Sequence, residues 1–280
     1  MPLSRIVRPA RTGLFLTSIG SFLVAGGGPK VAHAQTLQQQ ELEQTGLAAH
    51  SSKTWDIFLG AAVVSTNAYE GASSYRLRAA PFFLINYRDE LSIGPLGLTW
   101  KAIDWNGLRA GPVIGALGGR RQDLYFHLNG LGDVPASLAA GVFANYRLDH
   151  FELGMTFRQA VTHTSNGWLG LLHLDYQTAL MTPRLRLTVG PEVQFASHKY
   201  EQTFFGLTAA QSSDSGLPVF SPPGGVNDFG IHAALTYTYT KHFVMRLFAD
   251  ERWLGSDITG SPIVTRTTET LVGVGFAYHF

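Results

Sequence analysis

The feature that most constrains the fold of this chain is a period-two alternation of apolar with polar or small residues, which begins near Trp55 and continues to the last residue. It is clearest in the segment 226–239, where Phe229, Ile231, Ala233, Leu235, Tyr237 and Tyr239 alternate with Asp228, Gly230, His232, Ala234, Thr236 and Thr238. Successive side chains of a β-strand point to opposite faces, so the segment has one apolar face and one polar or small face. The segments 151–161 and 184–196 repeat the pattern.

The length of these segments decides between a soluble sandwich and a membrane protein. They run for roughly ten to thirteen residues, which matches a tilted strand that crosses a membrane. Strands of soluble proteins average about five or six residues. The chain also holds 18 Phe, 10 Tyr and 31 Gly, which is typical of aromatic-rich strands with small residues facing a lumen. The sequence therefore predicts an all-β fold, a transmembrane antiparallel up-and-down β-barrel, and it predicts no helix.

The connections between the segments alternate in length. Short ones are expected at 88–89, 104–107, 149–150, 182–183 and 240–242, and long ones at 66–74, 119–135, 197–225 and 255–267. Short periplasmic turns and long extracellular loops are typical of bacterial outer-membrane barrels. The predicted strands lie near 55–65, 75–87, 89–94, 96–103, 107–118, 136–148, 151–161, 168–180, 184–196, 226–239, 243–254 and 268–280. This even set of twelve places both ends in the periplasm, and it falls to ten if the pair around Gly94 and Pro95 is one irregular strand or a loop.

The first 34 residues have the organisation of a secretory signal. Arg5, Arg8 and Arg11 precede a short apolar stretch, and Ala32-His33-Ala34 is a small-residue cleavage site. The apolar stretch is too short to span a bilayer. We expect residues 1–34 to be a cleaved signal peptide, 35–54 to be a polar periplasmic segment, and 55–280 to form the barrel with a long extracellular loop at 197–225. The predicted location is the outer membrane of a Gram-negative cell.

Charge and cysteine content exclude several classes of function. Cleavage after Ala34 removes four of the 21 basic residues and none of the 20 acidic ones, which leaves a formal charge of −3. A mildly acidic body without a long basic tract gives no support to nucleic-acid binding. The chain has no cysteine, so neither a disulfide nor a thiolate site is possible. The histidines show no paired metal-ligand spacing, and we predict neither a metal nor a cofactor.

The last strand carries a sharp local signal. Val272, Val274, Phe276, Tyr278 and Phe280 should face one side, and Leu271, Gly273, Gly275, Ala277 and His279 the other. Gly275, Phe276, Tyr278 and Phe280 are similar to the C-terminal signal read by the barrel-assembly machinery. We therefore expect that machinery, outer-membrane lipid and lipopolysaccharide to be partners of the chain.

Charged residues of the strands should point into the lumen, because each would cost about 2 to 4 kcal/mol on the lipid face near the bilayer midplane. The predicted lumen residues are Arg76, Arg78, Lys101, Arg109, Arg147, Arg158, Arg184, Arg186, Arg246 and Arg252, with Asp56, Glu152, Asp175, Glu192, Asp228, Asp250 and Glu269. Two interpretations remain open. The charges either form an ion-pair network that fills a narrow barrel, or they line a channel that slightly favours anionic solutes.

One motif suggests an enzyme. His163-Thr164-Ser165-Asn166 is similar to the His-x-Ser-Asn motif of outer-membrane lipid A 3-O-deacylases, which use a serine nucleophile and a histidine base. Four residues in a loop rich in Ser, Thr, Asn and Gly are also ordinary turn chemistry. No matching acid is evident, and those deacylases have a smaller barrel. We therefore predict no catalytic residue, with deacylation through His163 and Ser165 as a remote alternative.

Several loop motifs resemble the MipA/OmpV family, the MltA-interacting outer-membrane proteins, across nearly the whole mature length. The most specific match is the loop 200–220, and the others are Tyr69-Glu70-Gly71 before 75–87, Leu131-Gly132-Asp133 before 136–147, Leu254-Gly255-Ser256, and Ser261-Pro262-Ile263-Val264. The resemblance implies a non-enzymatic scaffold that links a murein lytic transglycosylase to a murein synthase. Other members are described as porins or adhesins, so a small-solute porin or an adhesin is the alternative. The family supplies no catalytic residues to carry over.

Overall fold

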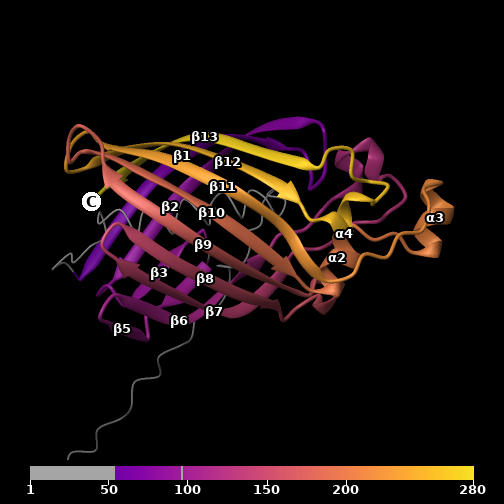
Figure 1. The fold of residues 1–280 in the computed structure, drawn as a ribbon, viewed down its shortest axis with the longest axis horizontal. Coiled ribbons are helices and arrows are strands. Elements are labelled where there is room, and N and C mark those ends of the chain that lie inside the picture. The colour runs from indigo at the N-terminus through magenta and orange to yellow at the C-terminus, as the bar shows by residue number, and fades with distance from the viewer. Residues whose placement is uncertain (1–53, 96) are drawn as a thin grey trace, which may run out of the picture.

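A computed structural model describes residues 54–95 and 97–280, so the expected signal peptide and most of the segment 35–54 lie outside the described residues. The described chain forms one antiparallel sheet that closes on itself as a barrel (Figure 1). Its strands are β1 (Trp55–Asn67), β2 (Tyr75–Tyr87), β3 (Leu91–Gly94), β4 (Gly97–Trp100), β5 (Ile103–Trp105), β6 (Leu108–Leu117), β7 (Ser137–Leu148), β8 (Phe151–Ala160), β9 (Trp168–Ala179), β10 (Leu185–Ala196), β11 (Gly225–Thr238), β12 (Phe243–Leu254) and β13 (Thr268–His279).

The ring closes through the first and last strands. β1 pairs with β13 from Phe58 opposite His279 to Thr66 opposite Leu271. The backbone N–H of Phe280 also donates to the carbonyl of Ile57 at 3.0 Å. Closure matters because an open edge in hydrocarbon would leave backbone groups without partners.

Thirteen strands fill twelve positions of the ring, because β4 and β5 lie end to end along β6. β4 pairs with β6 at Thr99 opposite Val113, and β5 pairs with the same strand at Ile103 opposite Ala110. The predicted twelve-strand barrel is confirmed, and the ten-strand alternative is wrong. The single strand predicted at 96–103 is also wrong. It breaks after Trp100, whose carbonyl oxygen approaches Gly111 so closely that a side chain there would collide with it.

The two ends of the barrel differ sharply (Figure 1). At one end, here called the short-turn end, strands are joined by tight turns in which Arg88, Asp89, Asn106, Asp149 and Met181 have positive φ. At the other, the long-loop end, the connections carry α2 (His198–Phe204), α3 (Ala209–Ser215), α4 (Ser256–Thr259) and the 3-10 turns η1 (Gln122–Leu124), η2 (Phe126–Leu128) and η3 (Thr164–Asn166). The alternation of short and long connections follows the sequence prediction.

The helices contradict the expectation of a chain without helix. They contain between four and seven residues, too few to show a helical period, and they depend on local capping. The Ser197 side chain accepts a hydrogen bond from the N–H of Tyr200, and Thr208 forms a capping box with Gln211. Among residues 54–95 and 97–280, none of the helices has the length and apolar character needed to cross a membrane.

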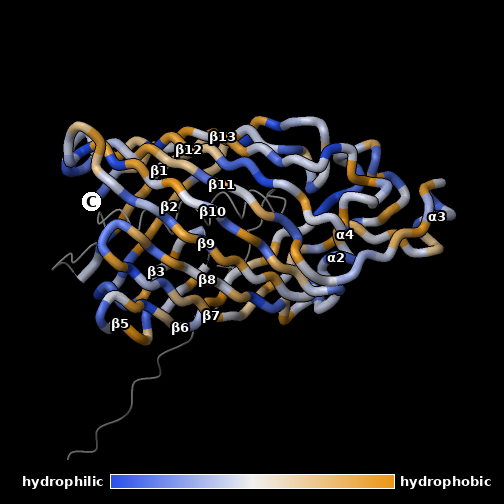
Figure 2. The backbone as a smooth tube through the Cα atoms, in the orientation of Figure 1, coloured by the Kyte–Doolittle hydropathy of each residue, from blue (hydrophilic) through white to orange (hydrophobic). Residues whose placement is uncertain are grey.

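The outer surface is apolar. Figure 2 shows orange and blue alternating along the strands, and the outward side chains Leu59, Leu153, Leu174, Ile231 and Leu247 are each between 43% and 48% exposed. Exposed aromatic residues flank them near the short-turn end (Trp55, Trp100, Trp105, Tyr239, Phe243) and near the long-loop end (Tyr75, Phe157, Phe195, Phe229, Trp253). An apolar band between aromatic girdles is how a barrel meets a bilayer. In β13, Val272, Phe276 and Tyr278 are exposed, as is Phe280 directly after the strand, and Leu271, Gly275 and Ala277 are buried.

Candidate functional site

The middle of the lumen wall is a network of buried charges. Asp175 lies 2.9 Å from Nε2 of His232 and 3.3 Å from Nδ1 of His173. Nδ1 of His232 is 3.6 Å from Glu192. All of these side chains are at most 3% exposed. The strand register explains the grouping, because Glu192 of β10 lies directly opposite His173 of β9.

Arg252 extends this network toward β12 and the long-loop end. Its guanidinium lies 3.2 Å from Asp250, 3.3 Å from Asp228 and 3.7 Å from Glu192. A buried charge without a partner is costly, and removal of one member of such a set leaves the others uncompensated. The arrangement cross-links four neighbouring strands, as the ion-pair interpretation of the lumen charges requires.

The other predicted lumen residues lie at several heights. Arg76 stacks on the Tyr125 ring at 4.5 Å, and Arg78 donates to the Tyr125 hydroxyl at 3.1 Å. The remaining contacts are Arg147–Glu152 at 2.7 Å, Lys101–Asp89 at 2.6 Å, Arg109–Asp104 at 3.8 Å, Arg246–Thr236 at 3.4 Å and Asp56–His279 at 2.5 Å. Arg158 follows the inward Thr156 on β8, and the inward carboxyl of Glu269 accepts from the N–H of Gly71 at 2.6 Å. Arg186 is exposed on β10, whereas Arg184 lies in the turn before that strand.

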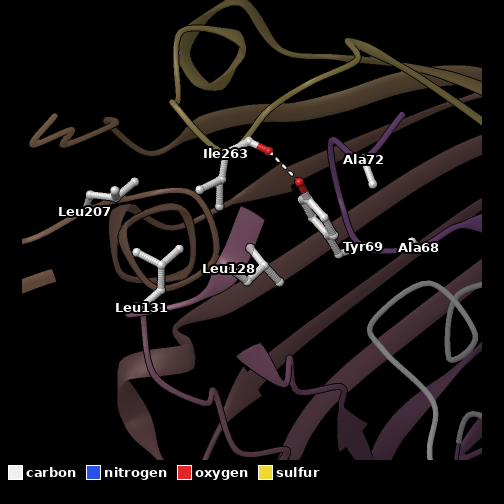
Figure 3. Close-up of a cluster of buried hydrophobic side chains, with 7 residues drawn as sticks. All are labelled: Ala68, Tyr69, Ala72, Leu128, Leu131, Leu207 and Ile263. Carbon is white, nitrogen blue, oxygen red and sulfur yellow. Dashed lines mark hydrogen bonds between the residues drawn. The ribbon is translucent and has the colours of Figure 1, made fainter. Parts of the chain in front are cut away.

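The long-loop end is covered by a packed layer of loops, which we call the loop cap and define as residues 68–74, 118–136, 197–224 and 255–267. Figure 3 shows one apolar cluster in it, formed by Ala68, Tyr69, Ala72, Leu128, Leu131, Leu207 and Ile263. Leu128 and Ile263 are completely buried. Four separate connections contribute to this cluster, so it draws together loops that leave the ring at different points.

A second apolar cluster includes residues of α2 and of the segments around it. It consists of Ala196, Tyr200, Phe204, Phe205, Leu254 and Ile258, each at most 5% exposed. Sequence reasoning missed both clusters, because the apolar residues of these loops follow no strand or helix period. The signal that was available is the presence of large apolar residues, such as Phe204 and Phe205, within otherwise polar, glycine-rich loops.

Hydrogen bonds between different loops fix the cap. The Tyr69 hydroxyl donates to the carbonyl of Ile263 at 3.0 Å, drawn as a dashed line in Figure 3. Ser261 donates to the carbonyl of Phe205 at 2.6 Å. Nη1 of Arg120 donates to the carbonyl of Phe204 at 2.5 Å, and burial lowers the pKa of Arg120 to about 10. Each bond joins residues far apart in sequence, so the cap behaves as one packed unit.

The cap encloses a pair of glutamates. Glu201 of α2 is 1% exposed and Glu70 is 6% exposed. The Tyr200 hydroxyl donates to Glu70 at 3.1 Å, and the side-chain amide of Asn227 donates to Glu201 at 3.3 Å. Burial, and next the nearby charge of Glu70, raise the pKa of Glu201 to about 8. Burial also raises the pKa of Tyr200, so its hydroxyl remains a donor.

The His163–Asn166 motif lies at the edge of the cap. His163 has a φ of 45°, and its Nδ1 lies 3.1 Å from the carbonyl of Ala136. The Asn166 side chain is buried and donates to Pro135 at 2.8 Å and Ser137 at 2.7 Å. In the part of the chain that the structure describes, no hydrogen bond joins the His163 ring to the Ser165 hydroxyl. The contacts of His163 and Asn166 hold a turn together.

Within the described ranges 54–95 and 97–280, no group of three or more His, Asp and Glu side chains is arranged to hold a metal ion. The buried histidines and carboxylates of the lumen wall instead bind one another.

Part of this chain is similar to known proteins. "Putative outer membrane protein YiaT" of Escherichia coli (strain K12) is 24% identical over 156 residues, 56% of this chain. The aligned part spans about half the length of that relative, 54%. The protein of the same name from Escherichia coli O157:H7 gives the same values.

Among solved structures, the chain is similar to Pseudomonas putida OprB, with a TM-score of 0.39 and 11% identity over 73% of this chain and 59% of that one. The translocator domain of the autotransporter NalP from Neisseria meningitidis has a TM-score of 0.37 and 10% identity, over 90% of this chain and 97% of that one. The model of the family described as "MltA-interacting protein MipA" matches residues 59–280. The chain therefore belongs to the MltA-interacting protein family and is an outer-membrane β-barrel.

Proposed function

We propose that this barrel is a non-enzymatic scaffold that binds periplasmic murein-remodelling enzymes at its short-turn end. The partners we infer are a murein lytic transglycosylase and a murein synthase. The family description, which names an interaction with MltA, supports this class of partner. Short turns face the periplasm in bacterial barrels, so the short-turn end is the surface that such enzymes would meet.

The observation that carries the proposal is the loop cap. Its first apolar cluster joins four connections from different points of the ring, and its second packs around α2 at the ends of β10 and β12. A general diffusion pore needs a hydrated path from mouth to mouth, and an apolar packed layer opposes one. The paired charges in the middle of the lumen wall also favour a scaffold over a pore, because they cross-link strands. These features suit a barrel that binds proteins better than one that conducts solutes.

The non-enzymatic part of the proposal rests on the geometry of the deacylase-like motif. The Asn166 side chain donates hydrogen bonds to Pro135 and Ser137, and the His163 ring contacts the carbonyl of Ala136. With these contacts the residues act as a turn. Lipopolysaccharide incubated with the purified protein should release no acyl chain, and release that depends on Ser165 would overturn this part of the proposal.

A small-solute channel that slightly favours anions is the second candidate. One observation favours it: the exposed side chains of Arg184 and Arg186 lie at the short-turn end, where they would attract anions toward the lumen. Conduction would require the loop cap to open. The two candidates therefore differ in whether the resting protein conducts.

The test combines binding and conductance on the same purified full chain in detergent. Binding to a purified lytic transglycosylase is measured by surface plasmon resonance for the wild type, for R88A/K241A in the short turns, and for R121A/R266A at the long-loop end. Each variant removes two positive charges from exposed positions. The scaffold proposal expects binding that weakens at least fivefold in R88A/K241A and stays within twofold in R121A/R266A.

Two results would contradict the scaffold proposal. Equal weakening in both variants would show that the attraction depends on overall charge and would contradict binding at the short-turn end. No binding of the transglycosylase or of a murein synthase, together with steady single-channel conductance in planar bilayers, would replace the scaffold with the channel.

A further inference from the structure

A cavity of about 260 Å³ lies at the short-turn end, where the β7–β8 turn meets the ends of β9 and β10. Its wall includes Arg147, His150, Gln177, Arg186 and Thr188. Pockets for drug-sized ligands are usually about 300 to 1,000 Å³, so this cavity suits a small solute or the end of a chain. It is far from the loop cap and plays no part in the mid-lumen ion-pair network.

The wall of the cavity is held in place by hydrogen bonds between its own residues. The N–H of Gln177 donates to the carbonyl of His150 at 2.7 Å, and Nδ1 of His150 lies 2.9 Å from the carbonyl of Gln177. A carbonyl only accepts, so Nδ1 of His150 carries the proton in this contact. The register places Gln177 opposite Thr188. The turn and the two strands therefore form a preorganised wall rather than a loose rim.

The two arginines of the cavity differ in their partners. Arg147 contacts one oxygen of Glu152, through Nε at 2.9 Å and Nη2 at 2.7 Å. Arg186 is exposed, and among residues 54–95 and 97–280 it forms no ion pair. Glu152 neutralises the guanidinium of Arg147, whereas an oxyanion in the cavity would accept from the planar donors of Arg186.

The polar residues of the wall favour the same class of ligand. Gln177 supplies amide donors and Thr188 a hydroxyl, both suited to the oxygens of an anion. Asp149 also lines the cavity, so its charge is mixed, and a ligand with a polar or cationic group beside its anionic end would fit. A long polyanion would not suit a space of this size and charge.

We propose that this cavity binds an oxyanion, a carboxylate or phosphate group carried by a small solute or by the end of a peptide. Arg186 is the principal binding residue, and Gln177 and Thr188 supply further donors. The site is independent of the scaffold proposal, because it would exist in a scaffold or in a channel.

Isothermal titration of the purified full chain in detergent at low salt tests the site. The probes are inorganic phosphate, succinate, and one short peptide prepared with a free or an amidated C-terminus. R186Q is compared with R184Q, which removes the same charge two residues away without touching the cavity wall. We expect R186Q to weaken binding of the tightest probe at least tenfold and R184Q to change it by less than twofold. A heat-modifiable shift on a gel verifies that both variants fold.

The outcomes separate the sources of the anion. Saturable binding of phosphate or succinate, lost in R186Q, indicates a free solute. Binding of the free peptide but not of its amidated form, again lost in R186Q, indicates a terminal carboxylate. Equal effects of R186Q and R184Q, or no saturable binding of any probe up to millimolar concentration, would overturn the proposal.

Discussion

At the scale of single residues, Glu201 makes the loop cap sensitive to pH. Its pKa is raised to about 8 by burial first and by Glu70 second, with smaller contributions from Asp228 and Asp257 and an opposing hydrogen bond from Asn227. An ordinary glutamate has a pKa near 4.5, so the packed cap binds a proton that the open cap releases. The free energy of opening should therefore fall as the pH rises from about 4.5 to about 8 and then level off.

Limited proteolysis of the cap across pH 5 to 9 measures this effect. The wild type should be cleaved faster at the higher pH, at sites within 197–224. E201Q keeps the shape and the Asn227 contact without a titratable proton, so it should lose most of the pH dependence. Identical pH profiles for the wild type and E201Q would mean that another group titrates.

At the scale of elements, the strands could be predicted and the cap could not. Each long strand has to separate lipid from lumen, and this imposes a period of two on its residues. The break between β4 and β5 depends on the approach of the Trp100 carbonyl to Gly111, a contact between segments that no local pattern encodes. The helices and clusters of the cap depend on contacts such as that of Tyr69 with Ile263, 194 residues apart. The lumen charges could be predicted from the sequence because lipid excludes charged side chains. Their ion-pair partners could not be predicted, because these depend on the register of the strands.

The last strand should control how efficiently the barrel assembles. Phe280 is 55% exposed on the lipid side, and its ring lies 4.8 Å from that of Tyr278. Truncation of Phe280 breaks this aromatic pair, which resembles the assembly signal, and leaves the backbone pairing of β1 with β13 intact. We expect F280A to reduce the folded, heat-modifiable protein in outer membranes several-fold.

A matched variant tests whether Phe280 acts as an assembly signal or only contributes apolar surface that faces lipid. Leu59 of β1 also faces outward and is 44% exposed, and L59A removes a comparable apolar side chain away from the C-terminus. Its yield should stay close to that of the wild type. If L59A and F280A reduce the yield equally, the terminal aromatic has no special role in assembly.

At the scale of the whole molecule, the barrel and the loop cap distribute their apolar and polar residues in opposite ways. The barrel has its apolar residues outside, facing lipid, and its charges inside, where those in the middle of the wall are paired. The loop cap has the arrangement of a small soluble core, with apolar residues inside and polar bonds between segments. Because the barrel wall is completed by strand pairing alone, the cap can open without breaking the ring. Whether the mouth is open or closed should therefore not affect the stability of the barrel.

Removal of the β10–β11 connection should therefore open the mouth and leave the barrel folded. This segment supplies Tyr200, Phe204, Phe205 and Leu207 to the two clusters, so replacing 198–223 with a short Gly-Ser linker removes part of both. In planar bilayers we expect conductance at least tenfold above that of the wild type. The control deletes 209–215 alone, because α3 has no buried residue and its loss should leave conductance unchanged. A wild-type protein that already conducts as well as the large deletion would show that the cap does not close the lumen.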